Sequence, residues 1–257
     1  MKVGILGAGV MGRAILKFFS DDEVFVCDRH SEKIKDIDSS KCFTNPDEMI
    51  QRVDILLFAI KPQDFDLLEK SLGISLQDKL VLSLMAGITL EHLKKVTKSN
   101  RVIRFMPNLA VQVSKGVTGW IPTSEVSSED LQFAKNLFNK MGVEVRLEEE
   151  RLIDVVTAIS GSGPAYFFYL AEALTKAGVN MGLSEMQARK LAEGTLIGSG
   201  KLLESENKSS AEWKKEIAVP SGTTEAAINA FREEDFEKIV LKGAKAGFNR
   251  AEELNQK

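Results

Sequence analysis

The chain has few of the side chains on which metal centres, disulfide frameworks and histidine-based catalysis depend. Its 257 residues include two cysteines, Cys27 and Cys42, and two histidines, His30 and His92. The cysteines stand in apolar surroundings and follow no metal-binding or redox spacing, so the sequence predicts no metal site and a reduced cytosolic compartment. His30 follows an expected strand and His92 lies in an expected helix, and we interpret both as surface residues rather than catalysts.

Long hydrophobic runs and an excess of one charge are also lacking. No stretch reaches about 18 apolar residues, and the first residues, MKVGILGAGVMG, have no apolar core followed by a small-residue cleavage site. We therefore expect a cytoplasmic protein without a membrane span. The 34 basic and 37 acidic residues give a formal charge of -3, which argues against nucleic acid as a partner.

The first 150 residues contain short apolar runs that alternate with amphipathic stretches. This alternation is typical of a parallel sheet with crossover helices, and strands that are apolar on both faces need helices on both sides. We therefore predict a doubly wound α/β sheet. The expected strands are 2–7, 23–28, 53–60, 79–86, 101–106, 116–121 and 143–147, and the expected helices are 11–20, 31–37, 46–52, 62–70, 89–97 and 128–141.

The turn after the first expected strand carries the spacing G-x-G-x-x-G in the segment GAGVMG. Gly7 permits a tight turn, Gly9 allows the backbone to approach a pyrophosphate, and Gly12 allows the following helix to pack closely. Asp28 follows about 20 residues later, at the end of the second expected strand. This context predicts a dinucleotide-binding domain of the Rossmann type.

The residues after the second strand leave the choice of dinucleotide open. Asp28 could accept a hydrogen bond from the ribose 2′-hydroxyl of NAD, whereas Arg29 and Ser31 could hold the 2′-phosphate of NADP. Farther along, the segment AIKP ends a strand at Pro62 and places Lys61 at the strand ends, where a cofactor would bind.

From about residue 152 the sequence is helical throughout. A segment that begins at Pro164 and ends at Gly178 is apolar nearly all round, which predicts a helix buried on several sides. The next helix begins at Ser184 with a capping box and has interior glycines, where we expect another helix or backbone to approach closely. We therefore predict a dinucleotide-binding domain at 1–151 and an all-α domain at 152–257 that dimerises and binds substrate, in a homodimer. The interior glycines are Gly194, Gly198 and Gly200.

The second half contains no histidine, which bears on the reaction that a nicotinamide could perform there. Reduction of a ketone leaves an alkoxide that needs a proton donor, commonly His, Lys or Tyr. Hydride addition to a protonated imine gives a neutral amine directly, so a hydroxyl near the nitrogen could suffice, and an imine is favoured over a ketone. Two segments, SGSGPA at 160–165 and VPSGTTEA at 219–226, precede expected helices and present backbone N–H groups suited to a substrate carboxylate, although helix capping would also account for them.

Several segments resemble, in order, the motifs of pyrroline-5-carboxylate reductases. They are GAGVMG, AIKP, SLMAGITLEHL, RFMPN, TAISGSGPAYFF, AGVNMGLS and VPSGTTEAAI, and they span nearly the whole chain. The resemblance implies reduction of 1-pyrroline-5-carboxylate to L-proline, the last step of proline biosynthesis, with NADP(H) or NAD(H) as cofactor. It also implies a homodimer with interleaved helical domains, stacking of dimers into larger rings, and a substrate pocket between subunits.

The resemblance assigns roles to individual positions. Thr224 takes the place of the family threonine that hydrogen-bonds the imine nitrogen and helps to deliver its proton. Gly222 and Thr223 would offer backbone N–H groups to the substrate carboxylate, with Val219 beside them. The positions expected at the cofactor are Gly7, Gly9, Val10, Met11 and Gly12 in the pyrophosphate turn, Asn45 near the adenosine portion, Ala59, Ile60, Lys61 and Ala86, and Arg29 from the argument above.

The chain leaves the family pattern at four positions. Leu109 and Ala110 replace Thr-Pro after Met-Pro-Asn, and Val219 and Ser221 replace Ser and the first Gly of Ser-Pro-Gly-Gly. Val219 removes a hydroxyl that in relatives can reach the substrate carboxylate, and Ser221 replaces a flexible glycine at the turn. The alternatives are therefore a divergent enzyme for another imine, a non-catalytic NAD(P)-binding homologue that acts through its dimer, and an NADP-dependent reductase of a deazaflavin.

Overall fold

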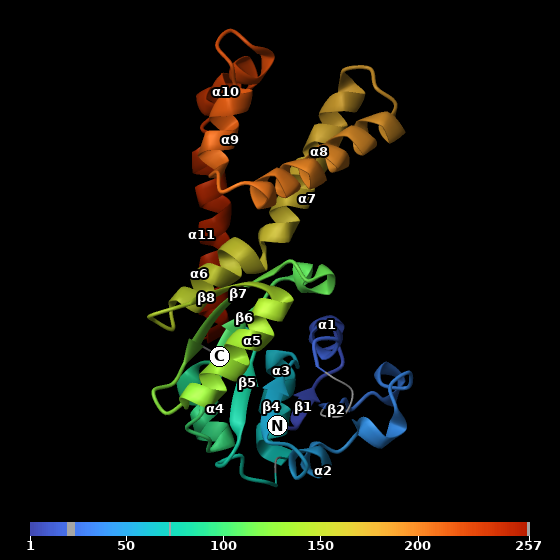
Figure 1. The fold of residues 1–257 in the computed structure, drawn as a ribbon, viewed down its shortest axis with the longest axis vertical. Coiled ribbons are helices and arrows are strands. Elements are labelled where there is room, and N and C mark those ends of the chain that lie inside the picture. Colours follow the sequence, from blue (N-terminus) through green and yellow to red (C-terminus); the bar gives the residue numbers. More distant parts are fainter. Residues whose placement is uncertain (20–23, 72, 256–257) are drawn as a thin grey trace. The chain divides into compact units, whose positions relative to one another are not determined.

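The computed structural model describes residues 1–19, 24–71 and 73–255 (Figure 1). Residue 20 of the expected helix 11–20 and residue 23 of the expected strand 23–28 lie outside the described residues. The chain divides into two compact units. We call Met1–Ser162 with Gly247–Lys257 the sheet unit, and Gly163–Ala246 the helical unit.

The sheet unit is built on one eight-stranded sheet with the strand order β3-β2-β1-β4-β5-β6-β7-β8. The first six strands are parallel and their order changes direction between β1 and β4, as in a Rossmann-type fold. This confirms the fold class predicted for the first half of the chain. The strands are β1 (Val3–Leu6), β2 (Val24–Cys27), β3 (Cys42–Phe43), β4 (Ile55–Phe58), β5 (Leu80–Ser83), β6 (Val102–Met106), β7 (Gly116–Pro122) and β8 (Gly142–Arg146).

Three features of the sheet unit differ from the sequence-based expectation. β3 has only two residues, too few for an apolar run to reveal it. β7 pairs antiparallel with β6, because residues 107–115 connect them without the crossover of a dozen or more residues that a parallel pair requires. The expected helix 31–37 is wrong, since only Ser31–Lys33 forms a short 3₁₀ turn there.

Helices cover both faces of the sheet, as expected for strands that are apolar on both sides. Alternate strand residues form two separate clusters, with Ile5 and Leu57 in the first and Leu6 and Phe58 in the second. Residues of α1 and α5 join the first cluster, and residues of α2, α3 and α4 join the second. These helices are α1 (Val10–Leu16), α2 (Pro46–Ile50), α3 (Pro62–Ser71), α4 (Leu90–Thr97) and α5 (Ser128–Met141).

A buried arginine ties the middle of the sheet to the segment after β8. Arg104 lies in β6 and is 1% exposed, and its Nη1 donates a hydrogen bond of 2.8 Å to Oε1 of Glu150. The same Glu150 oxygen accepts the N–H of Leu90, the first residue of α4, at 2.7 Å. Arg104 Nη2 lies 3.6 Å from Oδ1 of Asp154 in α6 (Leu152–Val156). One buried cation therefore fixes both the start of α4 and α6.

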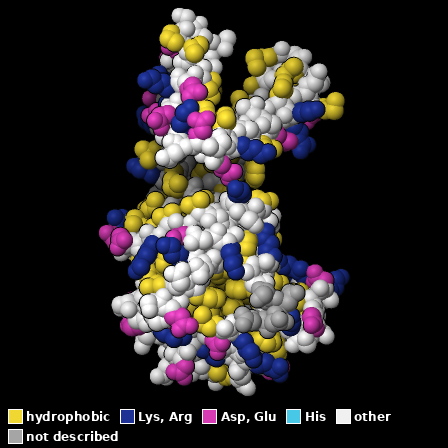
Figure 2. Space-filling view, in the orientation of Figure 1, with side chains coloured by type: hydrophobic (Ala, Val, Ile, Leu, Met, Phe, Trp, Pro, Cys, Tyr) yellow, Lys and Arg dark blue, Asp and Glu magenta, His cyan; other side chains and the backbone are white. Residues whose placement is uncertain are grey.

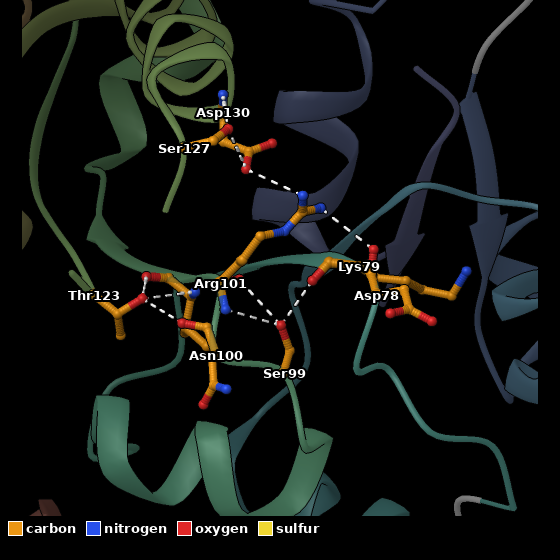
Figure 3. A network of polar contacts seen from close by, with 9 residues as sticks. Asp78, Lys79, Ser99, Asn100, Arg101, Thr123, Ser127 and Asp130 are labelled. Atoms are coloured by element: carbon orange, nitrogen blue, oxygen red, sulfur yellow. Dashed lines mark hydrogen bonds and ion pairs between the residues drawn. The ribbon is translucent and has the colours of Figure 1, made fainter. Parts of the chain in front are cut away.

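A second polar network joins the amino ends of β5 and β6 to their neighbours (Figure 3). Ser99 Oγ donates a 2.7 Å hydrogen bond to the carbonyl of Lys79, just before β5. Arg101 lies 3.5 Å from Asp130 of α5, and Thr123 at the end of β7 also bonds into this network. Because ligands of such sheets bind at the opposite, carboxyl ends of the strands, we assign this network to stability.

The helical unit consists of helices with little core of their own. Among its described residues, those that are buried in α7 and α8 are all glycine or alanine, and α9 and α10 have none. Apolar side chains lie instead on the surface of these helices (Figure 2), and Phe167, Phe168 and Tyr169 are all exposed. No described helix is long and apolar enough to cross a membrane. The helices are α7 (Gly163–Asn180), α8 (Glu185–Ser205), α9 (Ser210–Ile217), α10 (Thr223–Glu233) and α11 (Phe236–Asn255).

The glycines of these helices differ from expectation. Gly178 does not end α7 but is buried within it, where a Cβ would lie 3.0 Å from the Cβ of Ala188 in α8. The residue that adopts a left-handed conformation after α7 is Gly182, with φ +104. At Gly194, Gly198 and Gly200 a Cβ would meet no atom of the described chain within 4 Å, so the close approach expected at these glycines is not made by this chain itself.

The two units do not coincide with the predicted domains 1–151 and 152–257. α6 belongs to the sheet unit, and its Val156 packs against Gly119 of β7. The end of α11 also belongs there, because a Cβ on Gly87 would lie 2.7 Å from the carbonyl oxygen of Leu254. Packing therefore divides the chain after residue 162 instead of 151, and the division by function stays a prediction.

Substitution of Arg104 tests whether the buried cation anchors the fold. We expect Arg104→Met to lower the free energy of unfolding, measured by urea titration, by about 3–5 kcal/mol, because it removes the cation beside two carboxylates. The matched control is Arg151→Met, since Arg151 is exposed and pairs with exposed Glu149 at 2.8 Å. The control should change stability by about 0.5 kcal/mol or less. Equal stability of the two variants would contradict the anchoring role.

Candidate dinucleotide and substrate sites

The turn between β1 and α1 contains two glycines that leave no room for a side chain. Gly7 has φ +106, and a Cβ there would lie 2.5 Å from the carbonyl oxygen of Ala59. At Gly12, the third residue of α1, a Cβ would lie 1.9 Å from the carbonyl oxygen of Gly7. The helix therefore packs on the turn at a distance that only glycine permits.

Gly9 differs from both, because nothing in the described chain requires a glycine there. It is the N-cap of α1, and a Cβ on it would meet no atom within 4 Å. The open space lies at the amino end of the helix, where Val10 and Met11 begin the first turn and no described side chain caps it. A pyrophosphate is the kind of group that uses such access to bare backbone.

Asp28 holds this turn in place through its carboxylate. Its Oδ2 accepts the N–H of Ala8 at 2.8 Å, and its Oδ1 accepts the N–H of His30 at 2.9 Å. The side chain is 8% exposed, and the ammonium of Lys33 lies 3.7 Å from Oδ2. Asp28 therefore supports the glycine turn. It also lines the cavity described next, and each of its oxygens can accept a second hydrogen bond, so a contact with a ribose hydroxyl stays a prediction.

A cavity of about 280 Å³ lies at the carboxyl ends of β1, β2 and β4, where the strand order changes direction. Ligands of doubly wound sheets bind in this crevice. Leu67 and Leu68 of α3 give it an apolar wall. Cys27 contributes a neutral thiol, because burial raises its pKa to about 12. Of the residues predicted at the cofactor, the cavity is lined by Gly7, Gly9, Arg29, Ala59, Ile60 and Lys61.

The part of the cavity lining that follows β2 has cationic side chains beside Asp28. Arg29, His30 and Lys33 all line it. The Arg29 guanidinium is 59% exposed and pairs with Asp64 of α3 at 2.9 Å, and its Nε donates to Nε2 of His30 at 3.1 Å. Exposed Arg and Lys side chains suit a phosphate, which arginine can bind through two parallel hydrogen bonds. Arg29 and Lys33 thus offer two cationic groups to a 2′-phosphate.

Five of the residues predicted at the cofactor do not line the cavity: Val10, Met11 and Gly12, which form the first turn of α1, and Asn45 and Ala86. Asn45 caps α2, with its Oδ1 accepting the N–H of Asp47 at 3.0 Å, while the residues on either side of it line the cavity. Ala86 follows β5 and packs beside Met106. The second half of a dinucleotide would extend across the strand ends in the direction of β5, so a role for Ala86 stays a prediction.

The segment predicted to bind substrate forms the entrance to α10 in the helical unit. Val219 is 56% exposed, and its carbonyl accepts the N–H of Gly222 at 3.0 Å. That bond engages one of the two N–H groups expected for the substrate carboxylate. Gly222 is the N-cap and has no side chain to close the first turn, so the N–H groups of Thr223 and Thr224 remain at an uncapped helix end. Such a helix end attracts anions.

The hydroxyl of Thr224 has no hydrogen-bond partner among the described residues. Other helical threonines, such as Thr97, Thr157 and Thr175, donate their hydroxyl to the carbonyl four residues earlier. Thr224 is the second residue of α10, so no earlier turn of the helix offers it such a carbonyl. Its hydroxyl is therefore available to a ligand, and its role in binding stays a prediction.

The segment SGSGPA begins within a π-helical turn that the sequence did not predict. Here α6 continues into the π-helical segment Thr157–Gly161, in which the N–H of Ser162 donates to the carbonyl of Thr157 at 2.9 Å. The hydroxyl of Ser160 donates to the carbonyl of Val156 at 3.2 Å, so it serves the helix itself. Such π-helical turns often occur at functional sites. A run of small residues does not distinguish this geometry from an α-helix, so no sequence signal could have found it.

Comparison with known proteins covers both halves of the chain. Residues 150–254 match the family model described as pyrroline-5-carboxylate reductase dimerisation. Residues 2–87 match the model described as NADP oxidoreductase, coenzyme F420-dependent. The pyrroline-5-carboxylate reductase of Synechocystis is 32% identical over 266 residues, which cover 100% of this chain and 99% of the relative.

Solved structures extend the likeness to three dimensions. A pyrroline-5-carboxylate reductase from Coxiella burnetii has a TM-score of 0.89 and 26% identity, over 98% of both chains. A pyrroline carboxylate reductase from Plasmodium falciparum, solved with NADP bound, has a TM-score of 0.85 and 24% identity, over 99% of this chain and 98% of that one, and this likeness concerns the fold. On the full-length identity to the Synechocystis relative, the chain belongs to the pyrroline-5-carboxylate reductase family.

Proposed function

We propose that the protein is an oxidoreductase acting on CH–NH bonds that reduces 1-pyrroline-5-carboxylate to L-proline with NADPH, the last step of proline biosynthesis. One observation carries this proposal. Thr224, at the position of the family threonine, has a hydroxyl without a described partner beside uncapped backbone N–H groups. A hydroxyl and an anion-binding helix end are the two groups that a cyclic imine with a carboxylate requires.

The residues of the sheet unit fit NADPH. Gly9 leaves bare backbone for the pyrophosphate, and Arg29 and Lys33 are available to a 2′-phosphate. Asp28 lines the same cavity and keeps acceptor capacity for a ribose hydroxyl, so we include NADH as a weaker cofactor. The Plasmodium falciparum relative was solved with NADP, and residues 2–87 match an NADP oxidoreductase model. NADPH would supply the hydride, and the protein's residues bind and orient it.

The reaction on an imine explains why a threonine can suffice. The N–H groups of Thr223 and Thr224 bind the substrate carboxylate, and the Thr224 hydroxyl hydrogen-bonds the imine nitrogen and keeps its proton in place. Because the hydride neutralises a protonated imine, the product needs no further proton from a strong acid. Val219 contributes an apolar contact at this site, where the family pattern has a serine.

We also infer a homodimer formed through the helical unit. That unit buries no large side chain in α7 to α10, and its glycines in α8 have open space beside them. A second copy would fill this space, and the match of residues 150–254 to a dimerisation model supports it. Rings of dimers are part of the proposal.

We also propose that the protein is cytoplasmic, because its two cysteines are free and a reducing compartment keeps thiols reduced.

The reaction is tested directly with purified protein. We expect NADPH absorbance to fall when 1-pyrroline-5-carboxylate is added at neutral pH, and proline-like carboxylates to inhibit. The KM for NADPH should be about tenfold or more below that for NADH, because a hydrogen bond to a charged group contributes about 1.5–3 kcal/mol. Binding of NADPH without oxidation would instead support a non-catalytic homologue.

The role of Thr224 is tested by removing only its hydroxyl. Thr224→Ala should lower kcat by about 100-fold, the size of effect of removing one hydrogen bond to the reacting group. Thr224→Ser keeps a hydroxyl and should retain activity within about tenfold. Thr223→Ala is the matched control, because Thr223 contributes only its backbone N–H. The Kd for NADPH should be unchanged in all three variants, and full activity of Thr224→Ala would refute the assignment.

The two kinds of glycine in the nucleotide turn are separable by mutation. Gly9→Ala meets no atom, so it should cost about 1 kcal/mol or less of stability yet abolish measurable NADPH binding. Gly12→Ala collides with the carbonyl of Gly7, so it should lower the unfolding temperature severely. Isothermal titration and thermal unfolding distinguish the two effects. Wild-type affinity in Gly9→Ala would show that the pyrophosphate binds elsewhere.

A further inference from the structure

The turn that leads into α10 contains a residue in a strained conformation. Ser221 has φ +61, in the left-handed region that residues with a side chain seldom adopt. The glycine that the family pattern has at this position would adopt it freely. This chain therefore needs an interaction that holds Ser221 in place.

Glu225 supplies that interaction. Its Oε2 accepts the N–H of Ser221 at 2.8 Å, so the side chain reaches back from the first turn of α10 to the strained residue. The turn is otherwise closed by the bond from the N–H of Gly222 to the carbonyl of Val219. Since Gly222 has no side chain, Glu225 is the side chain that ties this turn to the helix in the described structure.

The position of Glu225 also matters electrostatically. It is the only acidic residue in the first turn of α10 among those described, next to the N–H groups that would bind the substrate carboxylate. A carboxylate that moved freely there would compete for those groups. The bond to Ser221 draws the Glu225 carboxylate back onto the turn and leaves the N–H groups of Thr223 and Thr224 to the substrate.

We propose that Glu225 is a positioning residue of the substrate site, required because this chain has Ser221 where the family has glycine. The inference rests on the proposed function. Glu225 acts through the turn: it holds Ser221 in the left-handed conformation and thereby sets the direction of the N–H groups of Thr223 and Thr224. Loss of Glu225 relaxes the turn and weakens binding of the substrate carboxylate, while the cofactor site in the sheet unit is unaffected.

The test measures both KM values and kcat for three variants. Glu225→Ala should raise the KM for 1-pyrroline-5-carboxylate about tenfold and leave the KM for NADPH within about twofold, because it removes a charge-assisted hydrogen bond of the turn. Glu225→Gln keeps an oxygen that can accept the Ser221 N–H and should stay near wild type. In the double variant Ser221→Gly with Glu225→Ala, glycine needs no support, so the KM for the imine should return to within about threefold of wild type.

The outcomes separate this inference from the proposed function. If the wild type is active but Ser221→Gly fails to rescue Glu225→Ala, or if both KM values rise together, the positioning role is overturned. If the wild type is inactive on the imine, the proposed function fails, and hydrogen exchange still tests the turn. The Gly222 amide, bonded to Val219, should exchange faster in Glu225→Ala and slow again in the double variant. Unchanged exchange in Glu225→Ala would overturn the inference.

Discussion

The contact between Gly12 and Gly7 is the constraint on which the nucleotide half of the molecule depends. A Cβ on Gly12 would lie only 1.9 Å from the carbonyl oxygen of Gly7, so α1 packs directly on the turn that follows β1. Ala14 and Ile15 of the same helix belong to the core of the sheet unit. This approach fixes the amino end of α1 above the strand ends. Gly9 then faces open space, so the backbone can be reached from outside. The three glycines therefore have three separate roles: Gly7 forms the turn, Gly9 leaves the backbone accessible, and Gly12 allows α1 to pack closely.

Three carboxylates hold backbone segments in place in the same way. Asp28 accepts the N–H of Ala8 in the glycine turn, Glu150 accepts that of Leu90 at the start of α4, and Glu225 accepts that of Ser221 before α10. Hydrogen bonds with an ionised partner are shorter and stronger than neutral ones. Each therefore helps to fix the backbone of its segment. The six residues concerned are Asp28, Ala8, Glu150, Leu90, Glu225 and Ser221.

The sequence predicted the parts of the fold that are set by periodicity and spacing, and missed those set by tertiary contacts. The apolar runs indicated seven of the eight strands, and the glycine motif indicated the nucleotide turn. The two-residue β3 is too short to leave a pattern, and Gly178 lies inside α7, where Ala188 packs against it. The engagement of the Gly222 N–H by Val219 depends on the backbone path of one turn, which residue types alone do not specify.

The helical unit has little hydrophobic core of its own, although it carries the proposed substrate site. Its buried residues in α7 and α8 are glycine and alanine, while large side chains such as Phe167 and Phe168 are exposed. Burial of apolar side chains is the main favourable term in folding, so this unit gains too little from its own contacts. The proposed second copy supplies the missing burial. Because Thr224 and its turn belong to this unit, the proposed substrate site would depend on the proposed dimer for its order, and imine reduction would then require folding and assembly together.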